Sequence, residues 1–151
     1  MSDFKPFDDK LAGLIEALSP ASRRRLTTQI AKELRRSQQL RIKQQKAPDG
    51  TPYQARRRQP LRAKKGRIKR AMFQKLRTSR YMKASGRNDA AVVEFSGKVQ
   101  RIAQIHQLGL KDRPNPHAHE MQYPKRQLLG FTTDNDTLIE EIILRYLNLE
   151  R

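Results

Sequence analysis

The sequence has no cysteine and no tryptophan, and only 6% of its 151 residues are aromatic. Without cysteine the fold relies on no disulfide, which suits a reducing cytoplasm. Apolar residues make up 36% of the chain, below the ~45–50% of ordinary soluble domains, so we expect a modest core. No apolar run approaches the ~18 residues that span a bilayer, and the N-terminal segment lacks the apolar core of a signal peptide. We therefore expect a single domain over residues 1–151, soluble, unexported and without membrane contact.

Acidic residues are absent from residues 56–87, which carry fourteen Lys or Arg. The formal net charge of the whole chain is +18. Such an excess opposes compaction of an isolated molecule and attracts polyanions. Residues 127–151, in contrast, carry more acids than bases. This asymmetry indicates that different faces of the molecule address different neighbours.

A long basic loop, or arm, is expected over residues 47–66, because the turn-forming segment APDGTPY interrupts the helix that precedes it. Loops of this length in small domains are commonly functional or disordered. No aromatic residue lies between residues 54 and 70, so base stacking and base reading are disfavoured, while salt-sensitive phosphate binding and a partner-facing arm remain alternatives. The candidate contacts to a partner or to DNA are Arg56, Arg57, Arg58, Arg62, Lys64, Lys65, Arg67, Lys69 and Arg70.

Helices are predicted at both ends of the chain by apolar residues at helical spacing. A short amphipathic helix is expected from about Asp8 to Ser19. Ser19 and Pro20 are typical of the N-cap and first residue of a second helix, which continues to about Lys46. The far end of that helix has few apolar groups and is expected to project. Thr132 or Thr133 caps a terminal helix whose broad apolar stripe favours a core role over a subunit interface.

The middle of the chain mixes helix and strand. We expect a short helix over residues 68–76, then a hairpin of strands Thr78–Ala84 and Ala90–Phe95. A helix over Lys98–Leu108 is expected to end at Gly109 in a left-handed conformation. A short edge strand within Ala118–Tyr123 is expected to return to the hairpin. The fold class is thus α+β, with a small antiparallel or mixed sheet of about three strands packed with a long N-terminal helix and a C-terminal helix.

Catalytic motifs are missing from the sequence: it has no nucleophile elbow, no Walker loop and no Gly-rich dinucleotide loop. His117 and His119, with Glu120 and Asp112, resemble metal ligands, but a structural zinc site normally needs four well-placed ligands, often with Cys, so coincidence in a Pro-rich loop is the better interpretation. His106 is interpreted as an imidazole packed on a helix and hydrogen-bonded to backbone. We expect a protein that is not an enzyme and that has no metal and no cofactor.

Four segments carry a resemblance to a known family. They are DGTPY after the long helix, KKGRIKRAMFQKLR before the hairpin, AVVEFSGKVQRIAQIHQLG, and YPKRQLLGFT before the last helix. In this order they resemble the phage virion morphogenesis, or S-type tail completion, family of contractile-tailed bacteriophages. The resemblance runs from about Leu11 to Leu147.

The resemblance implies a structural protein that is added late in tail assembly at the head-proximal end, in the neck region of the virion, after assembly in the host cytoplasm. Related tail-terminator and neck proteins share a small α+β fold and form rings, usually of six copies. The implied partners are further copies of the chain, tail tube and sheath proteins, and other tail or head completion proteins, with non-specific contact to DNA in the channel. From the charge pattern alone, a small basic DNA- or RNA-binding module is the alternative.

The resemblance also marks candidate structural or interface residues in three motifs. The expected roles are that Gly50 and Pro52 shape the base of the arm, and that the segment from Leu128 to Phe131 fixes the terminal helix. The residues that carry the three motifs are Asp49, Gly50, Thr51, Pro52 and Tyr53, then His106, Gln107 and Gly109, and finally Pro124, Arg126, Leu128, Leu129, Gly130 and Phe131.

Overall fold

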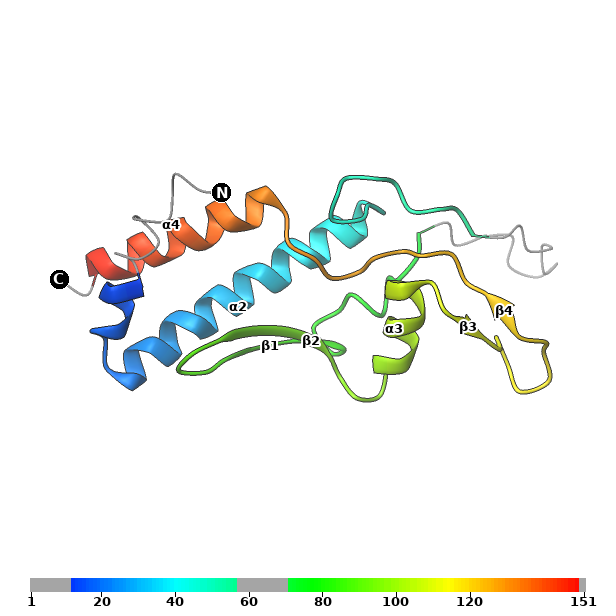
Figure 1. The fold of residues 1–151 in the computed structure, drawn as a ribbon, viewed down its shortest axis with the longest axis horizontal. Coiled ribbons are helices and arrows are strands. Elements are labelled where there is room, and N and C mark those ends of the chain that lie inside the picture. Colours follow the sequence, from blue (N-terminus) through cyan, green and yellow to red (C-terminus); the bar gives the residue numbers. More distant parts are fainter. Residues whose placement is uncertain (1–11, 57–70, 150–151) are drawn as a thin grey trace. The chain divides into compact units, whose positions relative to one another are not determined.

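The computed structural model describes residues 12–56 and 71–149. A helical turn at residues 12–16 precedes the labelled elements. In chain order these are α2 (Pro20–Lys43), β1 (Met82–Gly86), β2 (Ala91–Phe95), α3 (Gln100–Leu108), β3 (Lys111–Asp112), β4 (Met121–Gln122) and α4 (Thr133–Leu149) (Figure 1). The predicted α+β class is confirmed. Within the described ranges, no helix is long and apolar enough to cross a membrane.

The described residues group into two compact units. The first unit contains residues 12–36, 83–94 and 132–149. The second unit contains residues 37–56, 71–82 and 95–131. Helix α2 contributes residues to both, and the single domain expected from the sequence stays a prediction.

Both long helices begin at the residues that the sequence indicates. The Ser19 hydroxyl oxygen accepts a hydrogen bond from the Ser22 backbone N–H at 3.1 Å, which confirms Ser19 as the N-cap of α2. At α4, the Thr132 hydroxyl accepts a hydrogen bond from the Asn135 N–H, and the Asn135 side-chain oxygen accepts one from the Thr132 N–H, both at 3.1 Å. This reciprocal pair satisfies two backbone donors at the helix start.

The core of the first unit lies between α2 and α4. Leu26, Ile30 and Leu34 of α2 pack with Ile142 of α4, and α4 lies alongside the first part of α2 (Figure 1). The partly buried residues around them are Ile15, Leu18, Ala91, Val93, Leu138, Ile139, Ile143 and Tyr146. The apolar stripe of α4 therefore serves the core, as predicted.

The β1–β2 hairpin is held tightly against α2 in the same unit. A Cβ atom on Gly86, at the end of β1, would overlap the backbone of Thr28. Close by, the Thr27 hydroxyl donates a hydrogen bond to the Arg87 carbonyl at 2.5 Å. Glycine at position 86 is thus what lets the strand approach the helix backbone.

Two predicted elements of the second unit are wrong in part. Residues 71–76 are not helical, and residues 68–70 lie outside the described ranges. The backbone of Phe73 has φ +66°, which a right-handed helix does not allow. The first strand begins at Met82 and not at Thr78, because the Met82 N–H bonds back to the Thr78 carbonyl in a turn.

The short strand near residue 121 was predicted in the right place with the wrong partner. Strand β4 pairs antiparallel with β3, Lys111 opposite Gln122 and Asp112 opposite Met121, and not with the hairpin. Gly109 explains the pairing, because its left-handed backbone, with φ 67° and ψ 55°, ends α3 and turns the chain into β3. The predicted helix end at Gly109 is confirmed.

Candidate functional site

The three motifs marked in the sequence come together in the second unit. Hydrogen bonds join the extended segment from Pro124 to Phe131 to the end of α2, to the loop after it, and to α3. The structure thus places residues more than seventy positions apart around one segment.

Two glutamine side chains make the hydrogen bonds to this segment that a neighbouring strand would otherwise make. The Gln107 side-chain oxygen accepts hydrogen bonds from the N–H groups of Leu128 (2.8 Å) and Leu129 (2.9 Å), and its amide nitrogen donates to the Leu129 carbonyl at 2.8 Å. Gln38 does the same to Gly130, donating to its carbonyl at 3.0 Å and accepting from its N–H at 3.2 Å. The backbone groups of an irregular segment are satisfied in this way without a sheet.

Arg41 and Tyr53 add a second layer of polar contacts. The Arg41 guanidinium donates to the carbonyls of Leu128 and Lys46, the latter at 2.9 Å, and the Tyr53 hydroxyl donates to the Gln127 carbonyl at 2.7 Å. Burial raises the pKa of the Tyr53 phenol, which keeps it protonated as a donor, and burial lowers the pKa of Arg41.

The far end of α2 was expected to project, and that expectation is wrong. Gln38 is only 5% exposed and Ile42 is fully buried. Hydrophobic periodicity gave no sign of this, because Gln38 and the partly buried Arg41 are polar and are stabilised there by hydrogen bonds. Gln38 and Arg41 are therefore the site residues that the sequence did not reveal.

The loop that contains Asp49 and Gly50 forms a closed turn. The Asp49 carboxylate accepts a hydrogen bond from the Thr51 N–H at 2.9 Å, and that bond lowers the pKa of the exposed Asp49 carboxyl. Gly50 has φ +88°, and the Ala47 N–H donates to the Thr51 carbonyl at 2.9 Å. A Cβ on Gly130 would lie 2.6 Å from Cγ of Pro48. This loop therefore contacts the segment from Pro124 to Phe131, which we call the motif segment.

His106 stands in a row of aromatic rings. Ring centroids are 5.6 Å apart for Tyr53 and Phe73, 4.9 Å for Phe73 and His106, and 5.4 Å for His106 and Tyr123, all in edge-on geometry. Burial, followed by the charges of Arg126 and Arg56, lowers the pKa of His106, so the imidazole is neutral near pH 7. Its buried Nδ1 has no hydrogen-bond partner within the described residues, so the predicted bond to backbone is not seen at this atom.

Arg126 joins the motif segment to the start of the arm. Its Nε donates to the Gln54 carbonyl at 2.8 Å and its Nη2 to the Ala55 carbonyl at 3.2 Å, while its own N–H bonds to the His106 carbonyl at 2.8 Å. Burial, and then the neighbouring charge of Arg56, lowers the pKa of Arg126.

Residues 47–56 of the predicted arm belong to the described ranges. Of the candidate contact residues in this region, Arg56 alone is described, and it is exposed. The remaining candidates lie outside them, namely Arg57, Arg58, Arg62, Lys64, Lys65, Arg67, Lys69 and Arg70. In the motif segment the burial is uneven, since Leu128 is fully buried whereas Phe131 is 74% exposed.

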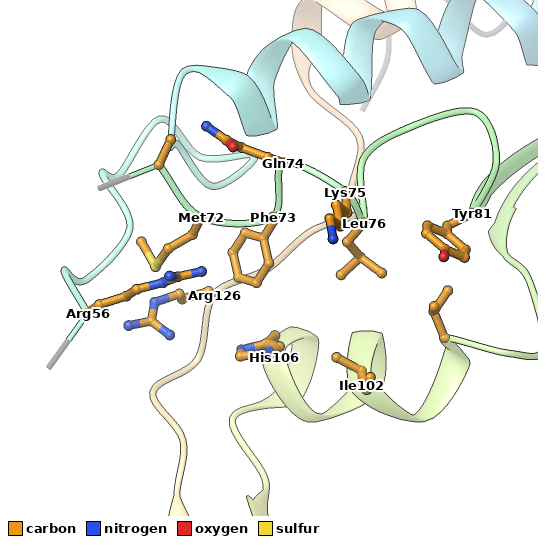
Figure 2. Close-up of a pocket in the computed structure, with 12 residues that line it drawn as sticks. Arg56, Met72, Phe73, Gln74, Lys75, Leu76, Tyr81, Ile102, His106 and Arg126 are labelled. Atoms are coloured by element: carbon orange, nitrogen blue, oxygen red, sulfur yellow. The ribbon is translucent and has the colours of Figure 1, made fainter. Parts of the chain in front are cut away.

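Arg56 and Arg126 lie at one end of a groove of about 440 Å³ (Figure 2). Apolar side chains line it from residues 71–76, which also contribute Gln74 and Lys75, and from α3, and His106 lies between them and the two arginines. No Asp or Glu is among the described residues that line it. The groove offers recognition chemistry, apolar contact beside positive charge, without a nucleophile paired to a base.

The histidines near residue 118 build no metal centre that can be seen in the structure. His117, His119 and Glu120 are exposed. Across residues 12–56 and 71–149, no group of three or more His, Cys, Asp or Glu side chains is placed to hold a metal ion.

Comparison with known proteins agrees with the resemblance seen in the sequence. No solved structure matches the chain. The tail completion protein S of Escherichia phage P2 is 51% identical over 148 residues, which cover 97% of this chain and 99% of that protein. Residues 2–148 match the phage virion morphogenesis family, and the chain therefore belongs to that family.

Proposed function

We propose that this chain is a structural tail completion protein, which works by binding other virion proteins and catalyses no reaction. The observation that carries the proposal is the 51% identity to a phage tail completion protein over nearly the full length of both chains. In this role the protein joins the head-proximal end of the tail, as a ring of six copies with a fold like that of tail terminators, and helps to join tail to head.

The architecture of the second unit supports a role in protein contacts. Buried Gln38 and partly buried Arg41 and Gln107 fix an irregular segment at some desolvation cost, which is typical of a surface that must keep one shape. Large apolar side chains of the same unit are exposed, and such groups commonly lie at protein interfaces. In the second unit they are Leu40, Ile102, Leu108, Leu110 and Phe131.

The basic arm has a place in the same proposal. Its cations would meet acidic surfaces of tail or head completion proteins, or the DNA that passes through the ring. The exposed guanidinium of Arg56 marks where this region leaves the described structure.

Inactivation of the gene in the phage or prophage that encodes this chain tests the proposal. We expect electron micrographs to show heads and tails that are not joined, and infectivity to return when the intact gene is supplied in trans. Joined, infectious particles in the absence of the gene would refute the tail completion role.

The nucleic-acid-binding alternative makes a different prediction for the purified protein. An assembly protein should form multimers without nucleic acid, which analytical ultracentrifugation measures. A monomer that binds duplex or single-stranded DNA tightly, with steep loss of affinity as salt rises, would favour the alternative.

A further inference from the structure

The groove of the second unit has two chemically different parts (Figure 2). One wall is made by Met72, Phe73 and Leu76, and the facing wall by Ile102 on α3. The volume of about 440 Å³ lies within the range of clefts that bind ligands of a few residues or less. Ile102 is 52% exposed, so an apolar occupant would remove surface from water here.

The other end of the groove holds two guanidinium groups that lie close enough to influence each other. Arg56 contributes to the lowered pKa of Arg126, next to the larger effect of burial. No carboxylate lines the groove among the described residues. Two like charges without a counter-ion are unfavourable, and an anion bound between them would relieve the repulsion.

The closeness of these two charges is built into the fold. Arg126 donates to the carbonyls of Gln54 and Ala55, the two residues directly before Arg56. The Arg126 N–H in turn is bonded to the His106 carbonyl at the end of α3. The cationic end is therefore fixed relative to the apolar walls, as a recognition site requires.

We propose that this groove binds a short peptide segment of another virion protein in which an Asp or Glu side chain stands next to apolar side chains. The carboxylate lies between Arg56 and Arg126, and the neighbouring apolar side chains fill the trough between residues 72–76 and Ile102. The inference deepens the proposed function and rests on it, because it names the chemistry of one docking partner.

Charge and shape favour this occupant over three others. The arm of the same chain has no acid in residues 57–70, so it cannot neutralise the arginine pair. A second copy is a poorer source of the carboxylate than an acidic partner, because the chain carries 33 basic and only 15 acidic residues. The phosphate backbone of DNA would satisfy the arginines but would leave the apolar trough unfilled, since backbone contacts are polar.

The test uses the full chain and pools of capped hexapeptides that combine one Asp or Glu with Leu, Ile, Val and Phe. Binding is followed by chemical-shift changes in ¹H–¹⁵N spectra. We expect the acidic pool to bind with dissociation constants below about 1 mM and to shift residues 72–76, 102 and 126. A matched pool with Asn or Gln in place of the acid should bind about fivefold more weakly.

Matched variants locate the binding. Arg56→Gln should weaken the acidic pool about fivefold, whereas Arg113→Gln, an exposed arginine away from the groove, should not. Ile102→Ser should weaken binding about tenfold, whereas Leu108→Ser should not, although both side chains are similarly exposed on α3 (52% and 57%). Circular dichroism confirms that each variant is folded.

Several results would overturn the inference. One is that the acidic pool does not bind, and another is that both pools bind equally. Loss of self-association on Ile102→Ser would show that a second copy fills the groove. A larger loss of duplex DNA binding on Arg56→Gln than on Arg113→Gln would show that DNA does. The first two leave the proposed function intact if inactivation of the gene still yields unjoined heads and tails. Joined particles without the gene would instead refute the proposed function, whatever the peptides do.

Discussion

Single polar residues decide how the second unit is held together. Gln107 is the clearest case, because one amide satisfies two N–H groups and one carbonyl of the segment that ends at Phe131. Gln45 repeats the arrangement at Met72, accepting from its N–H at 2.8 Å and donating to its carbonyl at 2.9 Å. Glutamine is suited to this because its side chain offers both a donor and an acceptor, as a peptide group does.

The substitution Gln107→Ala should destabilise the second unit by about 2–3 kcal/mol, because it leaves partly buried backbone groups of Leu128 and Leu129 without partners. Urea unfolding followed by circular dichroism measures the loss. Gln104→Ala on the same helix is the control, since Gln104 is exposed, and it should change stability by less than about 0.5 kcal/mol. Equal losses of stability in the two variants would contradict this role of Gln107.

His106 should make stability depend on pH in a stated direction. Its folded pKa lies below the ordinary value of 6.5, so the unfolded chain takes up the proton first as pH falls. The stability is therefore full above about pH 6.5 and is lost as pH falls from there through the folded pKa. Unfolding midpoints in urea between about pH 7.5 and 5 should fall less for His106→Phe than for the natural chain. If the urea midpoint falls equally in the natural chain and in His106→Phe, groups other than His106 cause the pH dependence.

At the scale of helices and strands, the features that depend on neighbours in sequence could be predicted. Ser19, Thr132 and Gly109 each act on backbone groups within a few residues, and all three were found from the sequence. The partner of β4 and the burial of Gln38 depend on contacts distant in sequence, which local patterns do not encode. The residues of the three motifs could be named from the sequence, but only the folded structure shows that the motifs lie together.

The contact between β1 and α2 gives an element-scale prediction. Gly86→Ala should destabilise the first unit by about 1–3 kcal/mol, because its Cβ would overlap the backbone of Thr28, which cannot move aside as a side chain can. Thermal unfolding measures the effect. Gly97→Ala is the control, since a Cβ there meets nothing within 4 Å, and a similar loss in both variants would argue against the close approach.

At the scale of the whole molecule, charge is the dominant property. A net charge of +18 on 151 residues makes the isolated protein depend on partners or salt to screen it. Much of the excess lies in residues 56–87, which contain no acid. The proposed role gives this charge a use, because the surfaces that relieve it become available when the particle is assembled.

Replacing Arg56, Arg57 and Arg58 by neutral residues tests whether the positive charge serves assembly of the particle. The triple substitution of Arg56, Arg57 and Arg58 by Gln should leave the thermal midpoint unchanged, since these three side chains are proposed to lie outside the core, and should lower the yield of joined particles at least tenfold. The control triple of Lys32, Lys111 and Arg113, all exposed, removes the same charge from other places and should leave the yield nearly unchanged. If the arm variant unfolds, these arginines belong to the core. If both triples lower the yield equally, net charge matters and the position of the arm does not.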